Sequence, residues 1–327
     1  AQPLERGSNN YYSIIQGRHT VRIGIPRALY YYRYGALWKT FFSSLGCEVV
    51  VSPRTDRAIL NQGTHYAIDE SCLSAKIYLG HVAWLLDKCD FVFVPRMADM
   101  GRDKEFCLKF RALPDVVYNT FRSEGVRLVT CDIAVRRGDS EMEAFAKLGK
   151  KLGFKKQQTF NAYLLAKQAE QQAAAENARK LDAALARPEL KVLVCGHAYN
   201  IYDRYIGRPV VDAIEANYAI AIPADWVDRD AAWQAGCELT DTMPWMVNRE
   251  LAGAAVQLHD KVDGIVLLSS FSCGPDSMTD EILTRRLKNI PILSMTLDGQ
   301  DATAGMETRI ESFIDILHLR KDGTVCL

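Results

Sequence analysis

The order of apolar runs constrains the fold of this 327-residue chain more than any other feature. Short β-rich runs alternate with longer segments whose apolar residues recur at helical spacing. The predicted strands are Val21–Ile25, Cys47–Val51, Asp90–Val94, Val126–Thr130, Lys191–Cys195, Ala219–Ile222, Gly264–Ser269 and Pro291–Met295. The predicted helices include Tyr30–Leu45, Cys72–Asp87, Leu113–Arg122, Pro209–Ala216, Pro244–Lys261, Pro275–Leu287 and Thr303–Leu317. This alternation is typical of parallel sheets covered by helices.

The middle of the chain has a different composition. Thr159–Ala186 is rich in Ala, Gln, Glu and Lys and contains neither Gly nor Pro, which predicts a long surface helix. No strict heptad is sustained, so a connector is favoured over a coiled coil. We therefore expect an α/β protein with two Rossmann-like domains, each with a parallel sheet, joined by a long helical connector. The expected boundaries are 1–20 for an N-terminal extension, 21–155, 156–187 for the connector, and 188–327.

The charge balance excludes some classes of partner. The chain carries 40 basic and 40 acidic side chains, whereas a nucleic-acid or anionic-membrane binder needs a basic surface. No apolar run approaches the ~20 residues that span a bilayer. Ala1–Thr20 is polar and has no apolar core of the secretory type, so we expect a cytoplasmic location.

Nine cysteines are many for a chain of this composition. An odd number without an export signal favours a reducing compartment over a disulfide framework. No C-x-x-C pair occurs, which disfavours a zinc ribbon or a ferredoxin-type loop. Cys47, Cys89, Cys131 and Cys195 lie in or beside apolar strands and are expected to be buried as small hydrophobes. Cys237 and Cys326 carry no local signal for either role.

Three cysteines lie where open α/β sheets bind ligands, in the connections that follow strands. Cys72 and Cys273 each stand at the predicted start of a helix, and Cys107 lies between a predicted strand and a helix. Helix N-termini favour the thiolate that binds metals. We therefore expect Cys72, Cys107 and Cys273 to face one crevice.

Several segments, in a fixed order, resemble the family of 2-hydroxyacyl-CoA dehydratases and their activase-associated proteins. They cover nearly the whole chain from residue 21 onward. The matching segments are Ile23–Tyr30, Leu37–Phe42, Asp69–Cys72 with Lys76 and His81, Phe91–Arg96, Phe106–Phe110, Gly196–Asp203 and Cys273–Ser277. The chain departs from the family at Asp298–Asp301, where relatives carry an acidic-His-Thr run, and at Leu108, where relatives often carry Pro.

The resemblance implies an oxygen-sensitive [4Fe-4S] cluster held by three cysteines from separate motifs, with one iron left for substrate or solvent. Carried over, the ligands are Cys72, Cys107 and Cys273. A related branch holds a double-cubane cluster with more ligands, and that alternative stays open for Cys131, Cys195 or Cys237. The resemblance also implies an ATP-dependent activase as the electron donor and an acyl-CoA or another small molecule as substrate.

Other residues are candidates for the surroundings of the cluster. Lys76 lies one helical turn from Cys72, and His81 lies farther along the same predicted helix, in the core or near the site. The remaining crevice candidates come from the two later motifs, and they are His197, Tyr199, Asp276 and Ser277.

The sequence supports three hypotheses about function. The first is an iron–sulfur protein of an ATP-driven low-potential electron system, which accepts an electron from a partner ATPase and reduces or binds a small substrate. The second is a 2-hydroxyacyl-CoA dehydratase-type lyase subunit, which ranks lower because those enzymes resemble two-subunit assemblies. The third is a non-catalytic cluster carrier or regulatory partner of an activase complex. The chain has no P-loop of its own, and a homodimer is left open.

Overall fold

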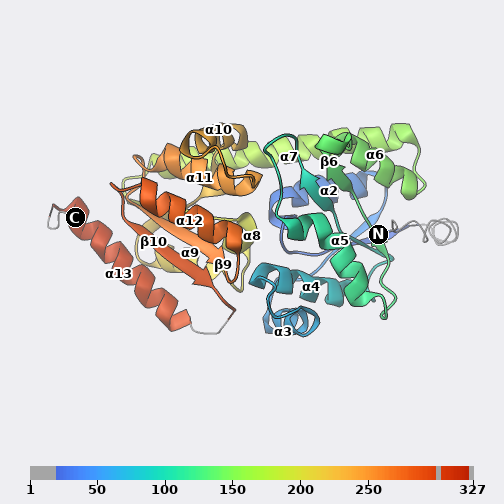
Figure 1. The fold of residues 1–327 in the computed structure, drawn as a ribbon, viewed down its shortest axis with the longest axis horizontal. Coiled ribbons are helices and arrows are strands. Elements are labelled where there is room, and N and C mark those ends of the chain that lie inside the picture. The colour runs from blue at the N-terminus through green and yellow to red at the C-terminus, as the bar shows by residue number, and fades with distance from the viewer. Residues whose placement is uncertain (1–19, 300–302, 324–327) are drawn as a thin grey trace.

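The computed structural model describes residues 20–299 and 303–323 and shows two parallel sheets of four strands each (Figure 1). The first sheet has the order β2-β1-β3-β5 and the second has the order β10-β9-β7-β8. Counted along the chain, both sheets have the same order: second, first, third, fourth. The first sheet contains β1 (Arg22–Ile25), β2 (Glu48–Val51), β3 (Phe91–Phe93) and β5 (Leu128–Val129). The second contains β7 (Leu190–Gly196), β8 (Ala219–Pro223), β9 (Gly264–Ser270) and β10 (Ile292–Leu297).

All strand pairs in these two sheets are parallel, which confirms the predicted α/β class. The continuous apolar runs explain the arrangement, because parallel strands covered on both faces read as unbroken hydrophobic segments. In β9 every residue is buried. A small parallel pair, β4 (Arg96–Asp99) and β6 (Asp132–Ala134), follows β3 and β5 in the first half and was not expected from the sequence.

Helices connect and cover the strands. Their bounds are α2 (Tyr31–Ser44), α3 (Arg57–Tyr66), α4 (Leu73–Leu85), α5 (Leu108–Phe121), α6 (Glu141–Lys151), α7 (Lys156–Leu185), α8 (Ala198–Tyr202), α9 (Arg208–Ala216), α10 (Arg229–Leu239), α11 (Met246–Leu258), α12 (Gly274–Arg286) and α13 (Thr303–Lys321). Two short 3₁₀ turns, η2 (Val135–Arg137) and η3 (Ala224–Trp226), complete the elements.

Four of these helices, α3, α6, α8 and α10, were missed in the sequence, although α3, α6 and α10 each begin with a side-chain cap. Asp56 and Asp228 accept backbone hydrogen bonds from Ile59 and Ala231, and Ser140 forms a capping box with Glu143. Helix α5 begins at Leu108 rather than at the predicted Leu113, with Pro114 inside it. The prediction placed that proline in the first helical turn, where proline is favoured.

The long helix α7 runs along both halves (Figure 1). It packs on α2 and α6 of the first half and contacts η3 and β8 of the second half. Glu170 on α7 forms an ion pair with Arg229 at the start of α10, with an N···O distance of 3.0 Å. The long helix therefore forms as predicted, while the division into domains at residues 155 and 187 stays a prediction.

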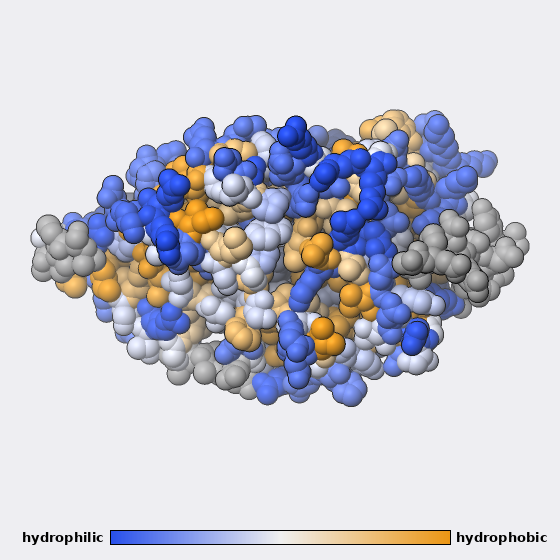
Figure 2. All heavy atoms as spheres, viewed as in Figure 1, coloured by the Kyte–Doolittle hydropathy of each residue, from blue (hydrophilic) through white to orange (hydrophobic). Residues whose placement is uncertain are grey.

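The two halves are joined by buried contacts as well as by α7. Arg33 donates two hydrogen bonds to the carboxylate of Glu250, of 2.7 and 3.0 Å, and both side chains are about nine-tenths buried. A single core cluster includes apolar side chains from both sheets. On the face in Figure 2, hydrophilic residues cover much of the surface and apolar residues form scattered patches. None of the helices in the described ranges combines the length and apolar character needed to cross a bilayer.

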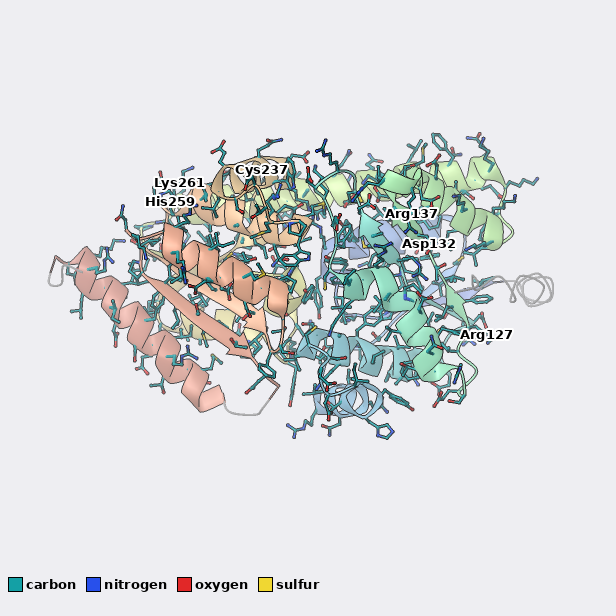
Figure 3. The ribbon with its side chains drawn as sticks, in the orientation of Figure 1. Arg127, Asp132, Arg137, Cys237, His259 and Lys261 are labelled. Carbon is teal, nitrogen blue, oxygen red and sulfur yellow. The ribbon has the colours of Figure 1, made fainter. Side chains whose placement is uncertain are left out.

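The cysteines separate into two groups. Cys47, Cys89, Cys131 and Cys195 are buried among apolar side chains, as expected. The others among the described residues are partly exposed, and they are Cys72, Cys107, Cys237 and Cys273. Cys237 lies on α10 (Figure 3), where its sulfur accepts a hydrogen bond from Arg249. Cys326, residues 1–19 and part of the Asp298–Asp301 run lie outside the described residues.

Two glycines let α3 and α4 cross in close contact, and α4 carries Cys72 at its start. A Cβ atom on Gly80 would overlap the carbonyl of Ile59, and one on Gly63 would overlap the carbonyl of Lys76.

We predict that Gly80→Ala lowers the free energy of unfolding by about 2 kcal/mol or more, because the backbone carbonyl that it meets cannot rotate away as a side chain can. Denaturant unfolding measures this change. Gly305→Ala on α13 is the control, since it meets open space and should stabilise by about 0.5–1 kcal/mol. Equal effects of the two substitutions would contradict the proposed role of the crossing.

Candidate functional site

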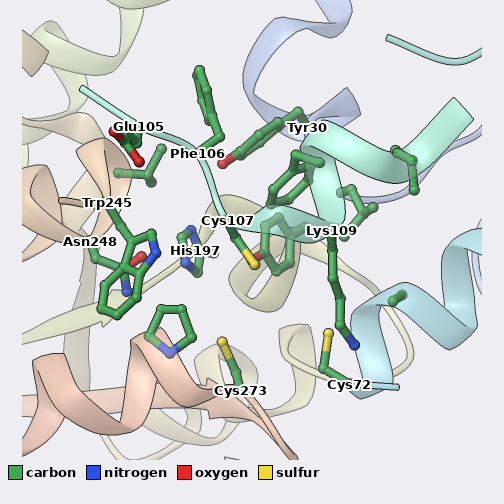
Figure 4. A pocket seen from close by; sticks show the side chains of 17 residues that line it. Tyr30, Cys72, Glu105, Phe106, Cys107, Lys109, His197, Trp245, Asn248 and Cys273 are labelled. Carbon is green, nitrogen blue, oxygen red and sulfur yellow. The ribbon is translucent and has the colours of Figure 1, made fainter. Parts of the chain in front are cut away.

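A pocket lies between the two halves, at the carboxyl ends of both sheets (Figure 4). Its walls come from the connections that follow β1, β4, β7 and β9, together with the starts of α4 and α11. In each sheet the first and third strands are neighbours, and the order reverses between them. Ligands of open α/β sheets bind at such switch points. The carboxyl ends of both sheets therefore face the same pocket. Its volume is about 530 Å³ when the open mouth is included.

Three of the pocket residues are cysteines, and each immediately precedes a helix. Cys72 is the N-cap of α4, Cys107 that of α5, and Cys273 that of α12. None of the three side chains caps its helix, so each sulfur is free of that role. In Figure 4 the sulfurs of all three point toward the same space. The partial positive charges of three helix N-termini thus meet around three thiols.

Backbone hydrogen bonds across the halves hold these loops in place. The amide of Leu73, next to Cys72, donates to the carbonyl of Phe271 over 2.7 Å. Glu105, two residues before Cys107, pairs with the second half through both of its backbone groups, over 3.0 Å to Pro244 and 2.9 Å to Met246. The thiols of the first half are therefore positioned by the second half as well as by their own sheet.

The thiols influence one another's ionisation. Burial raises the pKa of Cys273 and of Cys107, and the neighbouring Cys72 raises both pKa values further. Asp276 also raises the pKa of Cys273, whereas the amide of Lys109 lowers that of Cys107. Without a compensating positive charge, Cys107 and Cys273 are therefore protonated at neutral pH.

A buried histidine forms another wall of the pocket. His197 follows β7 and precedes α8, and its Nε2 donates to Oδ1 of Asp276 over 3.0 Å. Asn248 on α11 donates to the same oxygen over 2.9 Å. Burial would raise the pKa of Asp276, but the interactions with His197 and Asn248 outweigh burial and lower it. Asp276 itself lies behind the lining, in contact with Cys273.

Aromatic rings fill much of the remaining wall. The ring of Tyr199 stacks on His197 with centroids 4.7 Å apart, and Tyr30 stacks on Phe110 with centroids 4.0 Å apart. Tyr30 is buried, and it also lines the pocket. These rings make the pocket largely apolar, with its polar groups confined to a few positions.

Besides Asp276, three residues that were predicted to surround the cluster do not line this pocket. Lys76 is partly buried on α4 but lies outside the lining. His81 is fully buried, its Nε2 is 3.0 Å from the hydroxyl of Thr55, and burial lowers its pKa to about 3. Ser277 is exposed and donates to the carbonyl of Cys273 over 2.9 Å. His81 stands nine residues after Cys72, about two and a half helical turns along α4, so it lies on the opposite side of that helix.

The sequence interpretation missed several lining residues, notably Lys109, Trp245 and Asn248. Lys109 could have been predicted from the sequence, because it stands two residues after Cys107. Asn248 carries a second signal: it begins a run of three polar residues, with Arg249 and Glu250, inside the otherwise apolar start of α11. Asn248, Arg249 and Glu250 are all buried, and buried polar side chains require hydrogen-bond partners.

Among the residues that the structure describes, no group of three or more His, Cys, Asp or Glu side chains is arranged to hold a single metal ion. The three cysteines share a pocket, and their role as ligands stays a prediction.

Comparisons with known proteins give one assignment. The profile of the family described as CoA enzyme activase uncharacterised domain (DUF2229) matches residues 22–227. No curated protein matches the chain. Among solved structures, a putative phosphosugar isomerase from Bacillus subtilis is 9% identical, with 96% of this chain and 93% of that chain covered and a TM-score of 0.25. The C-terminal domain of glucosamine-fructose-6-phosphate aminotransferase from Francisella tularensis is 11% identical, with 96% and 87% covered and a TM-score of 0.21.

Scores this low carry no argument about fold or function. The family match covers the first sheet, α7 and the first strands of the second sheet, and so includes Cys72, Cys107 and His197. On that match, the chain belongs to the CoA enzyme activase uncharacterised domain family.

Proposed function

We propose that this chain is an iron–sulfur protein of an ATP-driven low-potential electron system. In this proposal Cys72, Cys107 and Cys273 hold a [4Fe-4S] cluster between the two halves, and a separate activase-type ATPase supplies electrons. The observation that carries the proposal is the meeting of three helix-initiating thiols in one pocket. Membership of a CoA enzyme activase-related family supports the link to an activase system.

The donor set fits an iron–sulfur cluster better than a single ion. Three thiols suit soft metals and Fe–S clusters rather than magnesium or calcium. The sulfurs around a single tetrahedral ion lie roughly 4 Å apart, whereas ligands of a cubane bind different irons and spread to roughly 6–7 Å. Three thiols that share a pocket without forming a single-ion site are compatible with the wider spacing.

The chain's own residues can offset the negative charge of three thiolates. The N-termini of α4, α5 and α12 direct partial positive charge at the sulfurs. Lys109 adds a cation to the lining, and in Figure 4 its side chain extends toward Cys72. The aromatic walls limit access of water, and hydrogen bonding, charge and solvent exposure set the potential of such a cluster.

When bound, such a cluster would accept and pass on single electrons. Three cysteine ligands for four irons leave one coordination position, which favours binding of a small molecule over electron storage alone. Around that position the chain offers His197 and the rings of Tyr30, Tyr199 and Trp245. These side chains can orient a small substrate and exclude water from it.

Ligand variants test the proposal. We predict that Cys72→Ala, Cys107→Ala and Cys273→Ala each remove most of the iron and sulfide that the anaerobically reconstituted wild-type chain binds, about four of each per chain. Iron and sulfide analysis with EPR of the reduced protein measures the loss. A variant of any of the three that keeps full iron content would contradict the assignment.

The matched controls are Cys47→Ala, Cys89→Ala and Cys195→Ala, whose side chains are buried away from the pocket. We expect these variants to keep their iron and to lose about 1 kcal/mol of stability through the missing sulfur. Loss of iron from these controls would instead favour a larger cluster with more cysteine ligands.

Because the ligands come from both halves, a bound cluster should hold the halves together. We predict slower proteolysis of the exposed face of α7, within 159–186, when the cluster is present than when it is absent. Anaerobic limited digestion measures the rates, with Cys72→Ala as the cluster-free form and Cys47→Ala as the cluster-bearing control. Equal rates in all forms would show that the cluster does not couple the halves.

A further inference from the structure

We propose that His197, held by Asp276, accepts a hydrogen bond from an O–H or N–H group of a small neutral molecule bound in the three-cysteine pocket. This inference deepens the proposed function, on which it rests for the identity of the pocket. It assigns a ligand-contacting residue and a class of ligand. Asp276 is then a positioning residue, because it acts on the ligand only through His197.

Two contacts fix the histidine ring, one with Asp276 and one with Tyr199. Its Nε2 donates to Oδ1 of Asp276 over 3.0 Å, and Asn248 holds that same oxygen over 2.9 Å. Asn248 is itself placed by Thr279, whose hydroxyl accepts a hydrogen bond of 3.2 Å. The ring of Tyr199 lies parallel to the imidazole, with 9° between the planes. The imidazole therefore has little freedom to turn, and it is already oriented before any ligand binds.

This arrangement leaves one ring nitrogen without a partner. A neutral imidazole has one N–H donor and one acceptor, and a carboxylate can only accept. In the neutral ring, donation from Nε2 to Asp276 puts the proton on Nε2 and makes Nδ1 the acceptor. His197 is only 4% exposed, and Nδ1 has no hydrogen-bond partner among the described residues. Buried polar atoms are nearly always paired, so a donor supplied from the pocket is the expected partner.

The same geometry recurs in catalytic sites where a carboxylate fixes a histidine tautomer and leaves the other nitrogen free for a hydroxyl. Here Asp276 holds Nε2, and Nδ1 is the free nitrogen. A hydrogen bond between His197 and Asp276 with a purely structural role would need no open space beside it, yet His197 lines the pocket.

The walls indicate the body of the ligand. Tyr30, Phe110 and Trp245 line the pocket together with Tyr199, which favours an apolar and flat molecule. The two charged side chains of the lining, Glu105 and Lys109, have opposite signs, so neither charge is favoured in the ligand. The predicted ligand class is a small neutral molecule with a compact apolar body and one hydrogen-bond donor. A single water could also satisfy Nδ1, and the experiment must distinguish that case.

Phenol and anisole form a suitable probe pair, since they share a flat apolar body and only phenol carries a donor. The protein is the full chain, treated with chelator to remove metal and labelled with ¹⁵N-histidine, at pH 8. We expect NMR to show His197 as the Nε2–H tautomer, with its Nδ1 resonance shifted by phenol and unchanged by anisole. Calorimetry should give phenol roughly fivefold tighter binding, the usual scale for one neutral hydrogen bond.

Two variants separate the free nitrogen from the structural contact. In His197→Gln the amide N–H can still donate to Asp276, but nothing replaces Nδ1, so phenol and anisole should bind equally. In His197→Asn the side-chain oxygen can take the place of Nδ1, so part of the preference should return. Thermal unfolding of both variants confirms that they are folded.

Equal binding of the two probes to the wild type, no binding of phenol, or an Nδ1 resonance that phenol leaves unchanged would overturn the proposal. The last result would mean that Nδ1 keeps a water instead of a ligand. A phenol preference that survives His197→Gln would also overturn it. Because no metal is present, these outcomes are independent of whether a cluster assembles on the cysteines, and each proposal can fail alone.

Discussion

The site depends on the fixed direction of parallel strands. In a parallel sheet every strand ends at the same edge, and the helices that follow begin there. This chain contains the arrangement twice, with the same strand order in each half, and the two edges face one pocket. Helix starts from both halves therefore meet in space. A cysteine at such a start is placed beside the pocket by the topology, which is how residues 72, 107 and 273 come together across 200 residues of sequence.

The second requirement is that the carboxyl ends of the two sheets keep a fixed position relative to each other. Helix α11 serves this purpose at its polar first turn. Glu250 pairs with Arg33 of the first half, and Asn248 holds the Asp276 carboxylate behind the pocket wall. Between them, Arg249 donates to the carbonyl of Met243 and to Cys237. Burying such groups is costly unless every partner is in place. The Glu250–Arg33 pair crosses between the halves and therefore favours one arrangement of them.

Sequence reasoning found the parts of the site that depend on local pattern. Cys72 and Cys273 could be placed at helix starts because a segment with helical features follows each of them. It did not give the strand order, nor which residues of α11 approach the pocket, because both depend on how distant elements pack. Trp245 lines the pocket only because its loop pairs with Glu105 of the other half. His81, which the sequence placed in the core or near the site, is fully buried on α4.

The most direct test of the central claim is iron anomalous diffraction from crystals of the full chain grown without oxygen. The account predicts anomalous density for iron in the pocket, within bonding distance of about 2.3 Å of the sulfurs of Cys72, Cys107 and Cys273. His197 should border the side of that density that no cysteine occupies. Iron density at Cys47, Cys131 or Cys237, or a crystal with iron bound to fewer than three of the proposed cysteines, would contradict it.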